Sequence, residues 1–411
     1  MRNAPLACSP KARAVLAKVL APHTQCECVH TLYRIYVMNS QNLSRLLTIT
    51  TYLIASNAFS AWAQAPVKGP EQSQDSSRSF KFYGLMEGHA IRDFGQSGPS
   101  DIFTDLASQP LDNSGGPKGK TRYTAETSRL GLDASTPING IALAAKLEID
   151  FYGYSPDKQN KPRLRQAYAE YGGWLVGKTW STFMDLDDLP ETVDFNGPIG
   201  APFSRRVMLR YAWGDADKGY KWTVALEQAK DQFGGGSSGE KLPIFVARVD
   251  KTLANGAYNV RVMSHEKRSP TTSKRGYGFG VGGRYKLTDK DTLMAQYTRV
   301  DGDLDMLYGS NGYAINATNG ALTFDKNQGV VLGYARVFSD QLRSNVALGF
   351  NRGQTAQAID NRSLSQIFAN LIYTPVKNLD LGMELIYGQR KNFTSDAGTM
   401  RRIDLMARYS F

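Results

Sequence analysis

The sequence predicts an all-β protein that crosses a membrane as a closed antiparallel barrel of about sixteen strands with up-and-down topology. Three observations predict this fold: an alternating C-terminal segment, a series of strand-like segments of similar length, and connectors that are short and long in turn. The composition agrees, since hydrophobic residues make up 41% and the mean hydropathy is −0.38. Residues 66–411 contain no run approaching the roughly 18 apolar residues of a spanning helix.

Residues 402–411 form the clearest two-faced segment. One face carries Ile403, Leu405, Ala407, Tyr409 and Phe411, and the residues between them are mostly polar. Strand side chains point to opposite faces in turn, so one face would meet lipid and the other the lumen. The aromatic residues Tyr409 and Phe411 suit the membrane interface, and we expect them to be the assembly signal. A strand of a soluble sandwich would alternate in the same way, so the rest of the chain decides.

The N-terminal region is predicted to direct export. Arg45 precedes a mostly apolar stretch, and the following Ala61-Trp-Ala63 provides small residues for cleavage, as in a secretory signal peptide. We expect residues 38–63 to be the signal peptide and residues 1–37 to be a misassigned upstream extension, because the signal has normal length if translation starts at Met38. A long, unusual targeting extension is the alternative. Residues 64–79 are predicted to be a periplasmic linker and residues 80–411 the barrel.

The cysteines and the net charge exclude several classes of function. Cys8, Cys26 and Cys28 all precede Met38, so the exported chain has no disulfide, thiolate metal site or cysteine nucleophile. We expect no metal and no cofactor. The formal charge of +11 falls to +6 without the six basic residues and one acidic residue of positions 1–65. Because this excess is not clustered, we expect no nucleic-acid partner.

From Phe80 onward the chain contains sixteen segments of about the length that a tilted membrane strand needs. They begin near Phe80, Thr127, Ile141, Arg163, Trp174, Arg205, Tyr220, Leu242, Ala257, Tyr277, Thr292, Gln328, Gln341, Leu364, Leu379 and Arg402. The third alternates most clearly, with Leu147 and Ile149 on one face and Lys146 and Glu148 on the other. The fourth and twelfth do not alternate cleanly, so their faces stay unassigned.

Connector lengths give independent support for a barrel. The short connectors are 135–140, 172–173, 214–219, 252–256, 288–291, 339–340 and 374–378, and the long ones are 94–122, 153–162, 180–204, 231–241, 266–276, 301–326, 352–362 and 389–400. The two kinds alternate strictly. Short periplasmic turns and long outer loops produce this pattern, and an even strand number follows if both ends are periplasmic.

Residues 177–200 read Gly-Lys-Thr-Trp-Ser-Thr-Phe-Met-Asp-Leu-Asp-Asp-Leu-Pro-Glu-Thr-Val-Asp-Phe-Asn-Gly-Pro-Ile-Gly. With Arg-Leu-Arg-Gln-Ala-Tyr-Ala-Glu-Tyr-Gly at 163–172 and Ser-Arg-Leu-Gly at 128–131, this stretch resembles the DcaP-like outer-membrane porins. The resemblance implies a trimeric, sixteen-stranded porin of the bacterial outer membrane that passes small anionic solutes, including dicarboxylates. In one respect the chain departs from the family: members can carry a helical segment ahead of the barrel, and residues 66–79 are too few for one.

The long connector 180–204 is predicted to fold into the lumen as a constriction loop. Apolar residues such as Phe183 and Met184 would be costly on an open loop tip. Its acidic cluster consists of Asp185, Asp187, Asp188, Glu191 and Asp194. Hydrogen bonding of these carboxylates to the lumen wall is one interpretation, and a calcium site without the EF-hand pattern is the other. The residues Asp188-Leu-Pro-Glu191 would suit the first turn of a short helix.

Basic residues on the lumen side of the predicted strands are candidates for solute selection. They include Arg129, Lys146, Lys221 and Arg284. Arg206 and Arg210 lie four positions apart on the same face of one strand, about 13 Å, so both could face the constriction. The alternative is that they pair with loop carboxylates such as Asp187 or Glu191 and hold the loop down.

Nothing in the sequence indicates an enzyme. The exported chain has two histidines, His89 and His265, without a recognisable serine partner. The glycines of 276–283 alternate with Tyr277 and Phe279 and so predict a strand rather than a cofactor loop. We therefore expect passive diffusion of small anions, with a plugged structural or adhesive barrel as the alternative. Lys267, Arg268, Lys274 and Arg275 would contact lipopolysaccharide phosphates or water, and the expected partners are outer-membrane lipid, lipopolysaccharide and two further copies of the chain.

Overall fold

The computed structural model describes residues 78–153, 161–215, 217–229, 240–354 and 360–411, and the predicted upstream extension and signal peptide lie outside them. The strands are β1 (Ser79–Asp93), β2 (Thr121–Thr124), β3 (Arg129–Ile138), β4 (Ile141–Gly153), β5 (Lys161–Tyr171), β6 (Trp174–Trp180), β7 (Arg205–Asp215), β8 (Tyr220–Glu227), β9 (Ile244–Leu253), β10 (Gly256–Arg268), β11 (Ser273–Lys286), β12 (Asp291–Asp301), β13 (Tyr313–Ile315), β14 (Leu322–Phe324), β15 (Lys326–Ser339), β16 (Leu342–Arg352), β17 (Asn361–Val376), β18 (Leu379–Asn392) and β19 (Ala397–Ser410). The described residues also contain one three-residue 3-10 turn, Leu106–Ser108. None of them forms a helix long and apolar enough to span a membrane.

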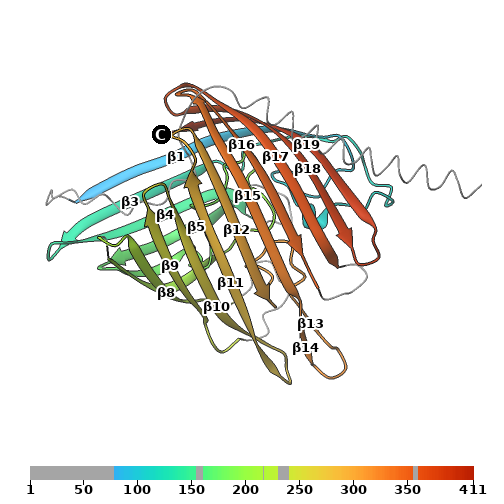
Figure 1. The fold of residues 1–411 in the computed structure, drawn as a ribbon, viewed down its shortest axis with the longest axis horizontal. Helices are drawn as coiled ribbons and strands as arrows, with labels where there is room; N and C mark the ends of the chain where they lie inside the picture. Colours follow the sequence, from blue (N-terminus) through green and yellow to red (C-terminus); the bar gives the residue numbers. More distant parts are fainter. Residues whose placement is uncertain (1–77, 154–160, 216, 230–239, 355–359) are drawn as a thin grey trace, which may run out of the picture. The chain divides into compact units, whose positions relative to one another are not determined.

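Sixteen of these strands close into one antiparallel barrel. Each long strand pairs with the next one along the chain, and β1 pairs with both β3 and β19. Figure 1 shows β15 to β19 side by side in this order. The short strand β2 is an addition, because it pairs with the outer part of β1, and β13 and β14 form a separate hairpin in a long connector. The predicted up-and-down barrel of about sixteen strands is confirmed.

The predicted starts of all sixteen barrel strands agree with the structure to within five residues. The two segments without clean alternation contain bulges, in which one extra residue interrupts the pairing. On β5, Gln166 pairs with Glu148 but Leu164 pairs with Ile149, so Arg165 has no partner in the ladder. A similar shift lies between Val337 and Ser339 on β15. The bulges turn neighbouring side chains to the same face, which explains why alternation fails there.

The barrel wall has an apolar outer face and a polar inner face. On β4, Leu147 is 48% exposed whereas Glu148 is 7% exposed. This is the reverse of a soluble core and suits a wall with lipid outside. The ends of the barrel differ as predicted. One end carries the short turns, and the other carries the long connectors; we call them the short-turn end and the long-loop end.

The barrel closes where the C-terminal residue meets β1. The backbone N–H of Phe411 donates to the carbonyl of Gly84 over 3.0 Å, and the N–H of Gly84 donates to the carbonyl of Phe411 over 3.1 Å. The rings of Tyr409 and Phe411 stack with centroids 6.5 Å apart on the outer face. A side chain on Gly84 would collide with the Phe411 ring, so glycine is required at this close approach.

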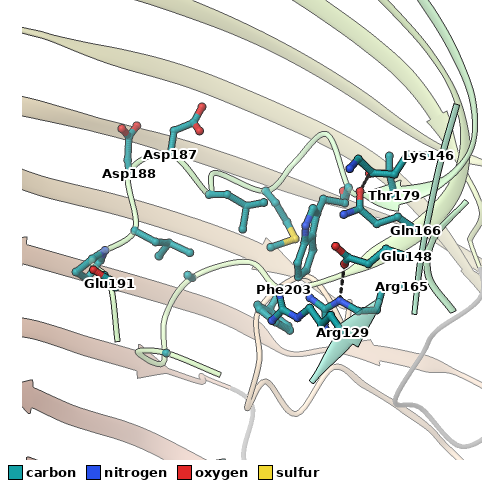
Figure 2. Close-up of a pocket in the computed structure, with 18 of the residues that line it drawn as sticks. Arg129, Lys146, Glu148, Arg165, Gln166, Thr179, Asp187, Asp188, Glu191 and Phe203 are labelled. Carbon is teal, nitrogen blue, oxygen red and sulfur yellow. Dashed lines mark hydrogen bonds and ion pairs between the residues drawn. The ribbon is translucent and has the colours of Figure 1, made fainter. Parts of the chain in front are cut away.

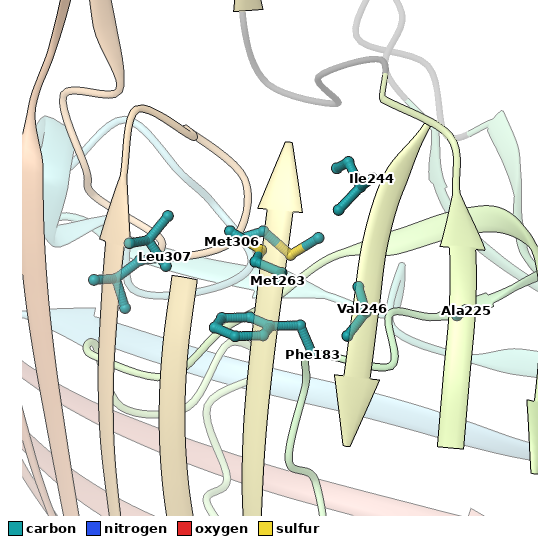
Figure 3. Close-up of a cluster of buried hydrophobic side chains, with 8 residues drawn as sticks. Phe183, Ala225, Ile244, Val246, Met263, Met306 and Leu307 are labelled. Atoms are coloured by element: carbon teal, nitrogen blue, oxygen red, sulfur yellow. The ribbon is translucent and has the colours of Figure 1, made fainter. Parts of the chain in front are cut away.

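The apolar core lies inside the barrel, where long connectors fold against the wall. Figure 3 shows Phe183 from one connector and Met306 and Leu307 from another packed on Val246 and Met263 of the wall. A second cluster joins Leu106 and Ile199 to β16, β17 and β18. Three connectors, 94–120, 181–204 and 302–325, therefore contribute buried residues to the interior.

Candidate functional site

The connector 181–204 between β6 and β7 folds into the lumen, as predicted, and is called the constriction loop below. Phe183, Asp185, Asp188 and Asp194 in this loop are each no more than 2% exposed. The loop contains no helix, so the predicted helical turn at Asp188 is wrong. Side-chain contacts with the wall, rather than backbone helix bonds, fix the segment that contains Pro190.

Glycines on the inner wall make room for the loop. A Cβ atom on Gly282 of β11 would lie 2.1 Å from Asp185 Oδ2, and one on Gly333 of β15 would lie 2.8 Å from Pro190 Cβ. On β18, a Cβ on Gly382 would lie 2.8 Å from Val193. The loop therefore rests directly on the strand backbones. The glycine-rich stretch 276–283 is part of a barrel strand, as predicted. Its glycines leave the inner face without side chains, and the loop packs against this face.

Buried carboxylates of the wall hold the loop at its start and near its middle. Glu227 on β8 accepts hydrogen bonds from the Ser181 hydroxyl and the Thr182 N–H, both over 2.7 Å. Glu384 on β18 accepts bonds from the N–H groups of Val193 and Asp194 over 3.0 and 2.9 Å. These bonds satisfy backbone donors that the loop would otherwise bury without partners.

The tip of the loop is an acid pair facing three arginines. Asn259 Nδ2 on β10 donates to Asp185 over 2.7 Å and to Asp188 over 3.0 Å, which brings the two carboxylates together. Arg284 contacts Asp188 at 2.9 Å, and Arg248 contacts Asp185 at 3.5 Å. The fully buried Arg261 lies 3.7 Å from Asp185. The tip is thus fixed to β9, β10 and β11.

The two carboxyls of this pair titrate differently. Burial and the neighbouring Asp185 raise the pKa of Asp188 to about 8. Burial acts in the same direction on Asp185, but Arg261 and Arg248 outweigh it, and the pKa of Asp185 lies below its ordinary value. One carboxylate and one protonated carboxyl therefore share the tip at neutral pH. Burial also raises the pKa of Asp187, which lines the cavity described below.

Glu191 anchors the middle of the loop on the opposite wall. Arg343 of β16 donates to both carboxylate oxygens, from Nε over 2.8 Å and from Nη2 over 3.0 Å. Arg408 of β19 lies 3.3 Å from the same carboxylate, and both arginines also contact Asp380 at 3.0 Å. This planar, two-contact geometry suits a guanidinium and a carboxylate.

A second basic cluster lies across the lumen from the loop carboxylates. Arg165 donates to Glu148 and to Asp150, each over 2.7 Å, and Arg163 binds Asp150 through two nitrogens. Arg129 lies 5.7 Å from the Phe195 ring centroid, and Arg205 lies 3.5 Å from that of Trp180. Figure 2 shows Arg129 and Arg165 near Phe203 on one side and Asp187, Asp188 and Glu191 on the other.

Between these walls lies a cavity of about 1620 Å³ that opens toward the short-turn end. Its lining includes Lys146, Lys221, Arg210 and Arg284 among the predicted residues. Lys146 pairs with Asp133 at 2.6 Å, and Arg210 pairs with Glu170 at 3.2 Å. Among the residues that the structure describes, no group of three or more histidine, cysteine or acidic side chains is arranged to hold a metal ion.

Arg206 differs from the expectation that it faces the constriction together with Arg210. It is 3% exposed and contacts Asp305 at 3.3 Å and Asp303 at 3.6 Å, in the connector after β12. That connector folds inward beside β7 and covers the guanidinium. The contact serves to hold a loop, as the alternative interpretation stated, but the acids are not Asp187 or Glu191.

Sequence reasoning missed Arg343, Arg248 and Arg165. Arg248 could have been found, because inward-facing Val246 and Asp250 flank it at spacing two on β9. Arg165 was hidden by the β5 bulge. Arg343 lies one residue inside β16, next to a short turn, where alternation has too few residues to assign a face.

Comparison with known proteins agrees with this architecture. The family model described as DcaP outer membrane protein matches residues 31–411. The crystal structure of the outer-membrane channel DcaP of Acinetobacter baumannii is 31% identical, with a TM-score of 0.75 over 81% of this chain and 97% of that one. No curated protein sequence matches the chain.

More distant solved structures share the fold alone. An anion-selective porin from Comamonas acidovorans is 11% identical, with a TM-score of 0.57 over 82% of this chain and all of that one. The trimer form of OmpT from Vibrio cholerae is 14% identical, with a TM-score of 0.54 over 82% of this chain and all of that one.

Proposed function

Because the chain belongs to the DcaP family of outer-membrane proteins, we propose that it is a passive porin for small anionic solutes, among them dicarboxylates. The barrel spans the bacterial outer membrane, and its relatives are channels rather than enzymes. The solute class, the direction of charge preference and the trimeric state are our proposals.

The observation that carries the anion preference is the balance of unpaired charge around the cavity. The cavity lining includes the cations Lys81, Lys221, Lys377 and Arg129. Among the described residues, none of these four takes part in an ion pair. Among the acidic residues of the lining, Asp187 and Asp340 form no ion pair with another described residue. A charge that is already paired contributes little net field in the cavity, so the unpaired cations determine the sign of the field that a solute meets. A narrow channel with low-dielectric walls concentrates that field.

Cations on two separate strands of the cavity lining favour a solute with two carboxylates. Arg129 lies on β3, whereas Lys221 lies on β8, and both line the same cavity. A dicarboxylate can approach one cation with each end, and a guanidinium can bind a carboxylate through two parallel hydrogen bonds. A monocarboxylate gains one of these attractions, so we expect dicarboxylates to enter more readily.

A homotrimer is the proposed assembly. Its support is the trimer form in which the distantly related OmpT has been solved, together with a difference on the outer wall. β3 and β4 present Ala134 and Ala145 outward, whereas β7 and β8 present Trp213 and Trp222. Aromatic residues are typical of lipid-facing interfaces, so β3 and β4 are the better candidates for subunit contact.

One observation favours the alternative of a plugged barrel. Besides the constriction loop, the connectors that contain Leu106 and Leu307 also fold inward, and Tyr308 donates to Asp105 over 2.6 Å between them. The long-loop mouth is therefore narrowed from three sides.

Planar-bilayer recording tests the proposal. The purified protein should give steady ohmic single-channel currents, and its reversal potential across a tenfold KCl gradient should have the sign of chloride preference. Swelling of proteoliposomes should be faster with succinate than with a diamine of similar size. An absence of ohmic current would favour the plugged barrel, and a reversal potential of cation sign would refute the anion preference.

A further inference from the structure

A row of basic residues crosses the outer face of the barrel near its long-loop end. Arg299 on β12 pairs with Gln328 on β15, and Gln328 pairs with Arg352 on β16. Arg352 pairs with Ser363 on β17, and Ser363 pairs with Lys391 on β18. Directly paired residues of antiparallel strands point to the same face. Arg299, Arg352 and Lys391 are therefore aligned, about 10 Å apart, since neighbouring strands lie about 4.8 Å apart.

Two further exposed cations lie next to this row. Lys326 lies two residues from Gln328 on β15 and so shares its face. Arg362 on β17 is the extra residue at a register shift between Asn361 and Ser363, beside the row. We call these five residues the basic rim: Arg299, Lys326, Arg352, Arg362 and Lys391. Figure 1 shows their strands, β12 and β15 to β18, side by side. Every strand in this part of the wall thus contributes one cation.

The rim cations lack the acidic partners that lumen arginines have. Within the part of the chain that the structure describes, no ion pair involves Lys326, Arg352, Arg362 or Lys391, and Arg299 has one long contact, at 3.4 Å to Asp301. In the lumen, by contrast, Arg343 contacts two carboxylates. A like-charged row without counter-charges repels itself, so it implies an anionic partner outside the chain.

Apolar residues lie directly below the rim on the same face. Tyr297 is two residues inside Arg299, and Phe350, 41% exposed, is two residues inside Arg352. Four residues inside Lys391 lies Tyr387, 45% exposed. The rim therefore stands at the level where the hydrocarbon region ends, which is where the phosphates of membrane lipids lie.

Exposed cations continue onto the strands next to this arc, with Arg275 on β11, Arg401 on β19 and Arg92 on β1. At the long-loop ends of β3 and β4, by contrast, the outward residues are Leu130, Ile149 and Phe151. A general need for solubility would place cations on these strands as well, so the difference between the two parts of the wall favours a specific anionic partner.

We propose that the basic rim binds the phosphate groups of the phosphorylated glycolipid of the outer leaflet, the lipid A part of lipopolysaccharide, with the acyl chains against the aromatic residues below. Guanidinium groups form charge-assisted, two-contact bonds with phosphate, which suits the arginines of the row. The proposal depends on the outer-membrane location and not on which solute crosses the lumen.

Native mass spectrometry of the folded, detergent-purified protein with added diphosphorylated lipid A tests the proposal. The variant R352Q/R362Q/K391Q should bind this lipid at least tenfold more weakly, since each cation near an anionic lipid surface contributes measurably to binding. The matched control K218Q/K286Q/K290Q removes three lysines at the short-turn end and should bind as the unmodified protein does. Dephosphorylated lipid A should bind both proteins equally weakly.

Heat-modifiable mobility on gels and single-channel conductance should be unchanged in the rim variant, which separates a lost lipid site from lost folding or lost channel activity. Equal affinity of the rim variant and the control for diphosphorylated lipid A would overturn the proposal. Equal binding of the dephosphorylated lipid to the unmodified protein would also overturn it. Displacement of the lipid by millimolar inorganic phosphate would assign the rim to free phosphate instead and would refute a lipid site.

Discussion

Arg343 and Glu191 form a two-contact ion pair that ties the constriction loop to the wall of β16, with N–O distances of 2.8 and 3.0 Å. The two side chains are 12% and 10% exposed. Both ends of the pair are thus largely shielded from water, and the loop segment around Pro190 depends on it. This contact fixes how far the loop reaches into the lumen.

Replacing Arg343 by Gln should loosen the loop and change the pore. Breaking a largely buried pair leaves a charge without its partner, and we expect a loss of about 2–3 kcal/mol in the anchoring of the loop, because Arg408 still contacts Glu191. Single-channel recordings should show a larger mean conductance and more open-channel noise. R336Q is the control, since Arg336 pairs with Asp291 at 2.9 Å away from the loop. Currents in R343Q identical to those of R336Q would contradict this role.

Substituting Gly282 by Ala should disturb the acid pair at the loop tip. The new Cβ would lie 2.1 Å from Asp185 Oδ2, and Asn259 and Arg248 restrict the movement of that carboxylate. Overpacking of this kind costs about 1–3 kcal/mol. The folded barrel of G282A should convert to the unfolded form at a lower temperature on heat-modifiability gels. G88A is the matched control, because nothing lies within 4 Å of a Cβ there. Equal conversion temperatures would show that the loop does not rest on this glycine.

Anion preference should fall as the pH rises through about 8. Burial and Asp185 raise the pKa of Asp188 from 3.8 to about 8, so the folded protein holds a proton there that an exposed aspartate would have lost. The stabilisation from this proton is complete below pH 3.8 and is lost as the pH rises through 8. Above that pH the cavity gains one negative charge.

Reversal potentials at pH 6 and pH 9 measure this change. In D188N the potential should vary little with pH, whereas D340N, which alters an exposed acid in a short turn, should keep the pH dependence of the unmodified channel. A pH dependence that persists unchanged in D188N would assign it to another group.

The sequence predicted the barrel well because the signals for it are local. Alternation and connector length depend on neighbouring residues, and they placed the third segment, with Leu147 outward and Glu148 inward, correctly. The loop's entry into the lumen also followed from its own apolar residues, such as Phe183. These features need no knowledge of which strand lies opposite.

The partners inside the lumen depend on contacts across the barrel and were therefore harder to predict. Glu191 is 152 positions from Arg343, and Arg206 is 99 positions from Asp305. No periodic pattern relates such residues, because they meet through loop paths that the sequence does not specify. The bulge at Arg165 adds a second reason, since one inserted residue reverses the assigned faces.

Deleting Phe411 should impair closure and assembly of the barrel. The deletion removes two backbone hydrogen bonds to Gly84 and the ring that stacks on Tyr409. Less heat-modifiable protein should reach the outer membrane, and more should appear unfolded in the periplasm. F411Y is the control, because it keeps the backbone bonds and an aromatic ring. Normal amounts of folded protein in the deletion variant would show that the terminal aromatic residue is not the assembly signal.

Charge selectivity should reverse or weaken when the unpaired lysines of the cavity become acidic. Lys81, Lys221 and Lys377 line the cavity, and among the described residues none of them takes part in an ion pair, so K81E/K221E/K377E removes three positive charges without breaking a salt bridge. Each substitution changes the local charge by two units, and the focused field of the lumen should then favour cations.

The zero-current potential across a tenfold KCl gradient should move toward the cation value, and succinate flux should fall by at least about threefold because the dicarboxylate meets repulsion where it met attraction. The control K218E/K290E alters lysines of the short turns outside the cavity lining and should leave both measurements near those of the unmodified channel. R210E gives an intermediate case, since Arg210 lines the cavity but shares its charge with Glu170. An unchanged potential in the triple lysine variant, with the barrel folded, would move selectivity to Arg129 and Arg165, which lie across from the loop carboxylates in Figure 2.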